Sequence, residues 1–297
     1  MSEDFLAQMA QASRARCERA RQLRSESQLQ DFISRLPPPP PLRLSREGFD
    51  LIAEMKLRSP AVGQLRAAAS EDVGARVLDY AAGGAAAVSV LTEPSRFDGS
   101  MRHLEQAALA LARPKVPAMR KDFLVDPYQV LEARAAGAGG VLVILRMLAR
   151  PALEALVDAA LEHGMFVLLE TFDAAEIEVA CEIVEARRGH GDGHGEASRD
   201  GREALLVGVN CRDLVTLQVV PGRLEALASR LPESVPRVAE SGVATAEDAA
   251  RMARVGYDLA LVGSALMSGG EPRALAAAML GAARAALGRR PRRGLPA

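Results

Sequence analysis

Several residue types are scarce in this sequence of 297 residues. It has no tryptophan, and the aromatic content is only 3%, which argues against base stacking on nucleic acid. Its 37 basic and 38 acidic residues leave a net charge of −1, so no overall field would attract nucleic acid or an anionic membrane. No apolar run approaches the roughly 20 residues of a membrane helix. We therefore expect no nucleic-acid partner and no membrane span.

Cysteine is also rare, and its three positions are widely spaced. Cys17, Cys181 and Cys211 form neither a disulfide framework nor a zinc-binding pattern. The chain starts with Glu3 and Asp4, whereas a secretory signal would start with Lys or Arg before an apolar stretch. A reducing, cytoplasmic location is therefore expected.

Lysine and asparagine are scarcer still. The lysines are Lys56, Lys115 and Lys121, against 34 arginines, and Asn210 is the only asparagine. Arginine provides a fixed positive charge, whereas lysine provides a compact amine that can titrate. The few lysines are therefore candidates for a role that arginine cannot fill.

Composition divides the chain into three parts. Residues 1–41 are predicted to be an N-terminal helical extension, because an amphipathic pattern over 2–35 favours a helix and the run Pro37–Pro41 forms a stiff connector. Residues 42–288 alternate short apolar runs with Ala-rich stretches that carry Arg and Glu. Residues 289–297 form a basic tail whose arginines are expected to be solvated.

The middle part predicts eight units of a strand followed by a helix. The predicted strands are 51–55, 86–91, 116–119, 140–145, 165–169, 205–209, 236–239 and 258–262, and the predicted helices are 71–82, 101–112, 127–137, 151–163, 174–187, 221–230, 245–255 and 271–287. This repeat favours an α/β fold, a single (β/α)8 TIM barrel, which typically takes about 250 residues. A doubly wound sheet is the alternative, but it requires a Gly-rich loop after the first strand, and Lys56–Pro60 is not such a loop.

One segment, residues 187–203, interrupts the repeat and is rich in Gly, Asp and His. His190 and His194 around Asp192 could suggest a metal site, but glycines do not hold ligands rigidly. We therefore predict a solvated insertion and no metal. Because it precedes the sixth strand, we expect it at the end of the barrel away from the mouth.

Polar residues stand at the ends of the predicted strands, where barrel enzymes place their chemistry. They are Glu54, Lys56, Lys121, Glu170, Asn210 and Glu240. A single Glu or Lys at such a place usually forms a rim salt bridge. Several around one mouth indicate acid–base chemistry, because close carboxylates and ammoniums shift each other's pKa values. We expect all six to face a common cavity.

Small residues follow the last two strands, as Ser241-Gly242 and Gly263-Ser264. Barrels frequently bind phosphate there through backbone N–H groups and a short helix, and Ser264 is expected to cap such a helix over 265–268. A substrate with a phosphate at one end is predicted. Phe97 and Phe123 lie in the second and third loops, either as loop packing or as an apolar wall for a ring-bearing substrate.

Seven sequence blocks together resemble the indole-3-glycerol phosphate synthase family. They are IAEMKLRSP (52–60), SVLTEPSRFDGS (89–100), RKDFLVDPYQVLEARAAGA (120–138), LLET (168–171), GVNCRDLVTL (208–217), VAESGV (238–243) and LVGSALM (261–267). They occur in order in seven of the eight predicted units. The helical N-terminal extension also fits this family.

The resemblance implies a reaction that needs neither metal nor organic cofactor. The substrate would be 1-(2-carboxyphenylamino)-1-deoxyribulose 5-phosphate, and the products indole-3-glycerol phosphate, CO₂ and water, in tryptophan biosynthesis. It implies that Lys121 is the general acid at the ribulose carbonyl and that Lys56 lies near the substrate carboxylate. The remaining implied roles are acid–base catalysis for Glu54 and Glu170, and orientation of the substrate hydroxyls and the lysines for Asn210 and Glu240.

The resemblance also implies the binding residues. The phosphate cradle would be Ser59, Ser241, Gly242, Gly263 and Ser264, and the ring pocket Pro60, Phe97, Phe123 and Leu142, with Arg212 beside it. The family usually has S-P-S-K-G after the first lysine, whereas residues 59–63 read S-P-A-V-G. This departure is expected to weaken phosphate or loop contacts more than the chemistry.

Two other functions stay open from the residues alone. Another sugar-phosphate barrel enzyme, an isomerase or aldolase, would share the phosphate cradle but would not need Phe97 and Phe123. A non-catalytic barrel that binds a phosphorylated ligand would have no use for two lysines at the mouth. The expected partner in each case is a phosphorylated small molecule, and the expected assembly is a monomer or weak homodimer.

Overall fold

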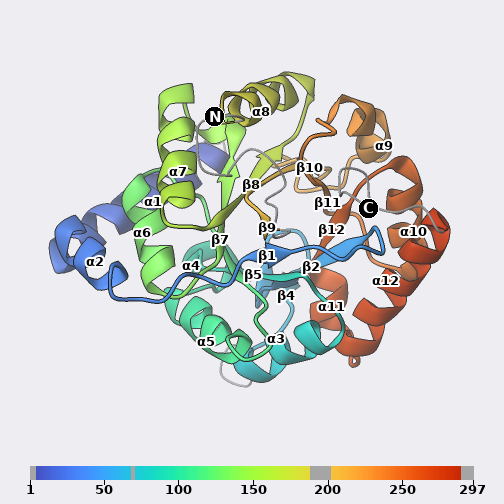
Figure 1. The fold of residues 1–297 in the computed structure, drawn as a ribbon, viewed down its shortest axis with the longest axis horizontal. Helices are drawn as coiled ribbons and strands as arrows, with labels where there is room; N and C mark the ends of the chain where they lie inside the picture. The colour runs from blue at the N-terminus through green and yellow to red at the C-terminus, as the bar shows by residue number, and fades with distance from the viewer. Residues whose placement is uncertain (1–4, 68–70, 188–201, 289–297) are drawn as a thin grey trace.

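The computed structural model describes residues 5–67, 71–187 and 202–288. Eight parallel strands form a closed barrel, in which they follow one another in chain order. They are β2 (Asp50–Met55), β5 (Ala87–Leu91), β6 (Ala118–Lys121), β7 (Gly140–Ile144), β8 (Phe166–Thr171), β10 (Leu205–Asn210), β11 (Arg237–Glu240) and β12 (Leu259–Val262). Pairing of β12 with β2 closes the ring. The predicted (β/α)8 fold is confirmed (Figure 1).

Helices cover the outside of the barrel, one after each strand. They are α3 (Val73–Ala82), α5 (Met101–Leu111), α6 (Pro127–Ala135), α7 (Arg150–Glu162), α8 (Ala174–Ala186), α9 (Arg223–Leu227), α10 (Ala246–Val255) and α12 (Pro272–Leu287). Their starts follow local signals in the sequence. The Asp126 side chain caps α6 ahead of Pro127, and Thr245 and Asp248 form the predicted capping box of α10.

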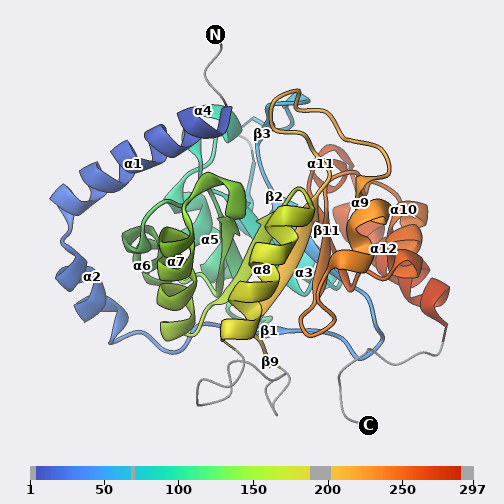
Figure 2. The same cartoon turned by 90° about the horizontal axis from the view of Figure 1, so that it is seen from above.

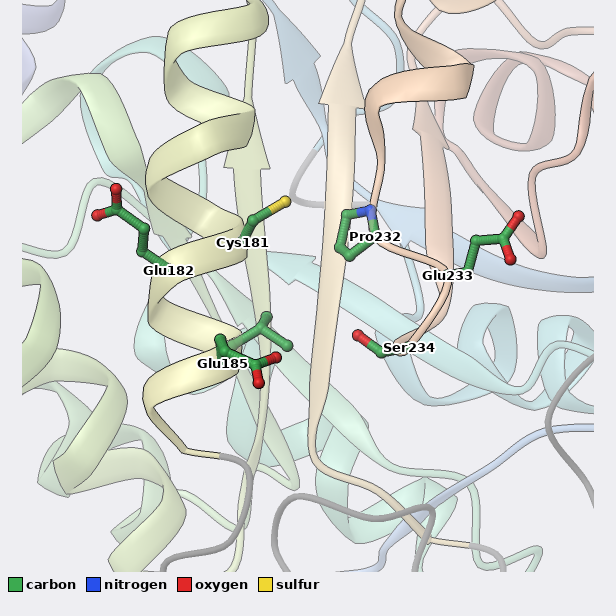
Figure 3. A pocket seen from close by; sticks show the side chains of 7 residues that line it. Cys181, Glu182, Glu185, Pro232, Glu233 and Ser234 are labelled. Carbon is green, nitrogen blue, oxygen red and sulfur yellow. The ribbon is translucent and has the colours of Figure 1, made fainter.

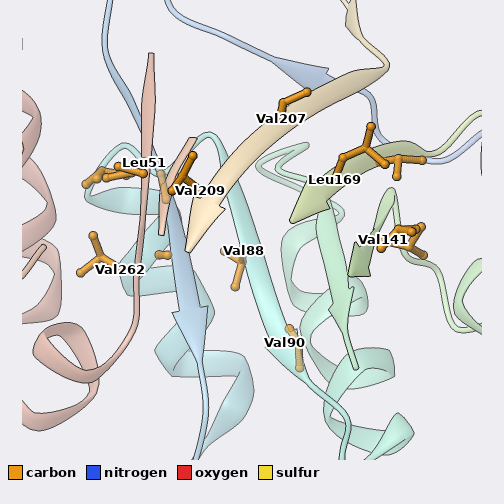
Figure 4. Packing of buried hydrophobic residues seen from close by; sticks show 14 of the residues in the cluster. Leu51, Val88, Val90, Val141, Leu169, Val207, Val209 and Val262 are labelled. Atoms are coloured by element: carbon orange, nitrogen blue, oxygen red, sulfur yellow. The ribbon is translucent and has the colours of Figure 1, made fainter. Parts of the chain in front are cut away.

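Apolar side chains alternate between the two faces of each barrel strand. Leu51, Val88 and Val141 belong to the cluster between the strands and the outer helices (Figure 4), whereas Ile52 and Leu142 belong to the cluster inside the barrel. Successive side chains of a strand point to opposite faces. A polar residue at an inward position near the end of a strand therefore faces the barrel mouth.

The N-terminal extension contains two helices, so the single helix predicted over 2–35 is wrong. α1 (Phe5–Leu23) and α2 (Glu26–Ile33) are separated at Ser25. The Ser25 hydroxyl accepts from the Gln28 N–H, and the Gln28 side chain accepts from the Ser25 N–H. This capping box starts a new helix. The prediction followed the apolar stripe alone and missed the S-x-x-Q pattern.

Short elements occupy both ends of the barrel. The loops carry β3 (Arg58–Ser59), β4 (Gly63–Gln64), α4 (Pro94–Phe97), α11 (Ser264–Ser268) and the 3₁₀ turns η1 (Leu145–Met147) and η2 (Ala228–Arg230). β1 (Leu42–Arg43) pairs antiparallel with β9 (Arg202–Glu203). Figure 2 shows α1, α4 and β3 at one end of the barrel and the β1–β9 pair at the other.

Most predicted boundaries differ from the structure by one or two residues, and two of the differences have a consequence or a clear cause. The third strand, predicted at 116–119, lies at 118–121 because Pro117 has no N–H to give to a central strand. This shift makes Lys121 the last residue of β6. The helix predicted at 221–230 is the short α9 followed by η2.

Two predictions fall on parts of the chain outside the described residues. Most of the insertion predicted at 187–203 lies there, because the structure describes residues up to 187 and again from 202. This includes the possible ligands His190, Asp192 and His194. The basic tail, residues 289–297, also lies outside the described residues.

Two glycines give opposite expectations for stability. A Cβ at Gly140 would fall on the ring of Phe166, so Gly140→Ala should lower the free energy of unfolding by about 1–3 kcal/mol. At Gly281 in α12 nothing lies within 4 Å of the Cβ position, so Gly281→Ala should raise it by up to about 1 kcal/mol. Urea denaturation measures both values, and effects of the same sign would contradict this account of the packing.

Candidate active site

A cavity of about 290 Å³ opens at the carboxyl ends of the barrel strands. Barrel enzymes hold their chemistry at this end. Every site residue singled out in the sequence lines it: Glu54, Lys56, Ser59, Pro60, Phe97, Lys121, Phe123, Leu142, Glu170, Asn210, Arg212, Glu240, Ser241, Gly242, Gly263 and Ser264. The structure therefore brings together the strand-end residues, the small residues of the last two loops and the two phenylalanines.

The acidic residues occupy inward positions near the ends of their strands. Glu54 lies on β2, Glu170 on β8 and Glu240 on β11, and all three are buried. Asn210 of β10 is the register partner of Glu240. Because side chains alternate between the two faces of a strand, these residues all point toward the inside of the barrel at its mouth.

Two ion pairs lie in the cavity. Lys56 Nζ is 2.5 Å from Glu54 Oε1, and Lys121 Nζ is 2.9 Å from Glu170 Oε2. The third carboxyl group has a weaker partner, because Glu240 Oε2 lies 3.7 Å from the same Lys121 Nζ. Three carboxyl groups thus share two ammonium groups.

These ion pairs shift the pKa values of the groups that form them. Burial raises the pKa of Glu54, but Lys56 and Lys121 outweigh burial, and the pKa lies below its usual value. Burial opposes the charge of Lys121, but the carboxyl groups of Glu170, Glu240 and Glu54 raise its pKa above its usual value. The Glu54 carboxylate and the Lys121 ammonium are therefore charged at neutral pH.

An aromatic cluster forms an apolar wall of the cavity. The rings of Phe97 and Phe123 lie 6.1 Å apart between centroids. Phe5 of α1 packs edge-on against Phe123 at 5.9 Å and also lines the cavity. Phe5 could not be assigned to the site from the sequence, because only the docking of α1 places it at the mouth. Such a wall fits a flat aromatic ring.

The loops after β11 and β12 line another part of the cavity. Ser241 and Gly242 both have positive φ, 65° and 72°, so the backbone turns sharply after β11. Gly263 is the N-cap of α11 and Ser264 is its first residue, with no side-chain cap. The prediction that Ser264 caps this helix is therefore wrong, because the helix starts one residue earlier. The first N–H groups of a helix lack partners within it and attract anions.

Gly263 has a second role that its position in the sequence did not reveal. A Cβ at residue 263 would fall on Glu54 Oε1 and lie 2.8 Å from Lys56 Nζ. Pairing of β12 with β2 creates this close approach. Glycine at this position therefore leaves space for the first ion pair.

A buried network fixes α1 beside Lys121. Arg16 Nη2 of α1 lies 2.6 Å from Asp122 Oδ1. Asp122 also accepts from Thr92 Oγ1 at 2.7 Å and pairs with Arg120 at 3.2 Å. Burial raises the pKa of Asp122, but Arg120 and Arg16 bring it below its usual value. Arg120 belongs to the same sequence block as Lys121, whereas Arg16 and Thr92 come from distant segments and could not be assigned to Asp122 from the sequence.

A second hollow, of about 660 Å³, lies outside the barrel between α8 and the segment before β11 (Figure 3). Its lining residues are Cys181, Glu182, Val184, Glu185, Pro232, Glu233 and Ser234. Three of these are glutamates and none is basic, so the lining offers no cation to a phosphate. The smaller cavity at the mouth is therefore the candidate active site.

Comparison with known proteins identifies the family. A sequence profile described as indole-3-glycerol phosphate synthase matches residues 3–187 and 201–279. Indole-3-glycerol phosphate synthase 1 of Streptomyces coelicolor is 40% identical over 230 residues, which cover 77% of this chain and 77% of that protein. The protein named indole-3-glycerol phosphate synthase in Nocardioides sp. is 41% identical over 234 residues, covering 79% of this chain and 81% of that protein. This chain belongs to the indole-3-glycerol phosphate synthase family.

The family profile skips residues 188–200, which fall within the insertion predicted at 187–203. Solved structures show the same fold at low identity. The 3-hexulose-6-phosphate synthase of Salmonella typhimurium has a TM-score of 0.56 at 16% identity, over 79% of this chain and 98% of that chain. Thiamine phosphate pyrophosphorylase of Pyrococcus furiosus has a TM-score of 0.54 at 15% identity, over 82% and 98%.

No helix within the described ranges 5–67, 71–187 and 202–288 combines the length and hydropathy of a membrane span. The His, Cys, Asp and Glu side chains of the same ranges form no group of three placed to hold a metal ion.

The space beside Gly263 can be tested through stability. Gly263→Ala should lower the free energy of unfolding by about 1–3 kcal/mol, because the added methyl group displaces the Glu54–Lys56 pair. Gly270, in the same loop region, has nothing within 4 Å of its Cβ position. Gly270→Ala is the matched control and should change the value by no more than about 0.5 kcal/mol. Guanidinium denaturation measures both, and equal losses would show that Gly263 provides no special space.

Proposed function

We propose that this chain converts 1-(2-carboxyphenylamino)-1-deoxyribulose 5-phosphate into indole-3-glycerol phosphate, CO₂ and water, as a carboxy-lyase of tryptophan biosynthesis. Membership of the indole-3-glycerol phosphate synthase family supports this activity. The observation that carries it is the cavity itself. Two lysines paired with buried glutamates share one cavity with an aromatic wall and with the loops after β11 and β12.

Ring closure requires an acid beside the substrate carbonyl. The ring carbon that bears the carboxylate attacks the ribulose carbonyl carbon, and the carbonyl oxygen takes up a proton. Lys121 is the proposed donor, because its raised pKa keeps it protonated before the substrate arrives. Glu170 holds the amine in position at 2.9 Å.

The later steps need a second acid and a base. When CO₂ leaves, the electrons of the broken C–C bond restore the aromatic ring, so the step needs no electron sink. The new hydroxyl leaves as water after protonation, and a base removes a proton from the carbon beside the nitrogen. Lys56 is the proposed second donor, near the substrate carboxylate. Glu54 and Glu170 are the proposed acid–base carboxylates.

The other lining residues are proposed to bind and orient the substrate. Asn210 and Glu240 orient its hydroxyl groups and the lysines. The phosphate is assigned to Ser59, Ser241, Gly242, Gly263 and Ser264, and the anthranilate ring to Pro60, Phe97, Phe123 and Leu142, with Arg212 beside it. Backbone N–H groups at a helix start suit a phosphate, and offset aromatic rings suit the anthranilate.

We expect a monomer or weak homodimer in the cytoplasm, with a phosphorylated small molecule as its partner and no nucleic acid.

Substitution of Lys121 tests the proposed acid. Lys121→Arg keeps the positive charge but replaces the compact ammonium with a planar guanidinium, which does not give up its proton in proteins. Turnover should fall on the order of 10²-fold or more, the scale of general acid catalysis. The assay follows the fluorescence of the indole product as it forms from the anilino-ribulose substrate.

Lys115→Arg provides the matched control, because Lys115 is exposed and does not line the cavity. It should leave turnover unchanged. Near-normal turnover of Lys121→Arg would remove Lys121 from the proposed role. A wild type that forms no indole product would refute the proposed function itself.

A further inference from the structure

Glu240 is a buried acid whose carboxyl group lacks a hydrogen-bond donor. Glu240 is 1% exposed, and neither of its carboxyl oxygens has a hydrogen-bond partner among the described residues. The nearest cation is Lys121 at 3.7 Å, which already holds Glu170 at 2.9 Å. A fully buried carboxylate without donors is costly, so the protonation of Glu240 requires an explanation.

Gly208 creates the space that Glu240 occupies. It lies at an inward position in the middle of β10, where glycine has a poor strand propensity. A Cβ at residue 208 would fall on Glu240 Oε1 and lie 3.1 Å from both Glu240 Cδ and Leu168 Cδ1. Gly208 is also the register partner of Glu170. The Glu240 carboxyl group thus rests over Gly208, on the side of the barrel where Glu170 stands.

The charges around Glu240 are unbalanced. Glu170, Lys121 and Glu54 are the charged groups that act on it, from β8, β6 and β2. Glu54 already has Lys56 as its partner at 2.5 Å, so one ammonium serves both Glu170 and Glu240. Two adjacent carboxyl groups with one cation keep a proton between them.

We propose that Glu240 is a neutral carboxylic acid that donates its proton as a hydrogen bond to the Glu170 carboxylate, and that Gly208 is the positioning residue that admits it. This inference rests on the proposed function, in which Glu170 holds Lys121 in position. The hydrogen bond would hold Glu170 between an ammonium and an acid. The Glu170 carboxylate then faces Lys121, the proposed general acid, while the Glu240 carboxyl group remains uncharged.

The direction of the pKa shift agrees with this geometry. Burial and the neighbouring Glu170 raise the pKa of Glu240 well above its usual value, and Lys121 only partly opposes them. An unfolded chain ionises Glu240 near its ordinary pKa of about 4.3. Above that pH the unfolded state loses the proton before the folded state does, so the contribution of Glu240 to stability falls as pH rises.

The first test needs no substrate. Glu240→Gln replaces the acid with a neutral isostere. The free energy of unfolding of this variant, relative to that of the wild type, should therefore increase as pH rises from about 4 to 8. Glu247→Gln, at a side chain that is 80% exposed, is the control and should run parallel to the wild type. Infrared spectra at pH 7 should show a protonated carboxyl band in the wild type that Glu240→Gln lacks. Parallel stability curves together with absence of that band would overturn the proposal.

The second test asks whether Gly208 acts through Glu240. Gly208→Ala should lower kcat about tenfold or more by displacing the carboxyl group. Glu240→Ala removes that group, and adding Gly208→Ala to it should cost no more than about twofold. Glu240→Gln keeps a donor for Glu170 and should retain kcat within about tenfold of the wild type. If Gly208→Ala lowered kcat equally in the wild type and in Glu240→Ala, Gly208 would serve only the fold and would not act through Glu240.

The two tests separate this inference from the proposed function. If the wild type formed no indole product, the proposed function would fail while the stability and infrared results would still report the protonation of Glu240. If the product formed but the Glu240→Gln curve ran parallel to the wild type and the band were absent, only the inference would fail.

Discussion

The sharing of two ammonium groups among three buried carboxyl groups is the interaction on which the barrel mouth depends. Lys56 and Lys121 each hold one carboxylate within 3 Å. Removing one member of such a pair leaves an uncompensated buried charge, which is strongly unfavourable. The pairs therefore place the amines accurately before a substrate enters. Because Glu240 has no ammonium of its own, the cluster also contains a site for an extra proton.

The barrel makes this cluster possible through a simple alternation. Each strand directs one set of apolar side chains to the helices and the other set to the interior, as Val167 and Leu168 of β8 do. Near the carboxyl ends the inward set changes from apolar to charged residues. Leu168 is followed on the same face by Glu170, and Val238 of β11 is followed by Glu240. The same packing that stabilises the fold thus aims the carboxyl groups at the mouth.

The N-terminal extension is part of the mouth as well as a neighbour of the barrel. Arg16 joins α1 to Asp122, which follows directly after Lys121. Phe5 at the start of the same helix packs against Phe123. A polar contact along α1 and an aromatic contact at its tip therefore fix the loop that directly follows the proposed acid, Lys121.

The sequence by itself determined the class of fold and the residues that gather at the mouth. Eight apolar runs separated by amphipathic stretches permit few architectures, and strand-end positions are readable because side chains alternate with a period of two. Boundaries depended on local signals. The capping box at Ser25 and the missing N–H of Pro117 were both present in the sequence, and the apolar pattern alone overlooked them.

Only the tertiary structure decided which groups touch. The aromatic contact of Phe5, the ion pair of Arg16 with Asp122 and the space above Gly208 and Gly263 each join segments far apart in the chain. Local periodicity contains no information about such distances. A glycine in a strand looks the same in sequence whether it faces solvent or a carboxyl group. Closure of the barrel supplies the difference, because it brings the inward faces of all eight strands around one axis.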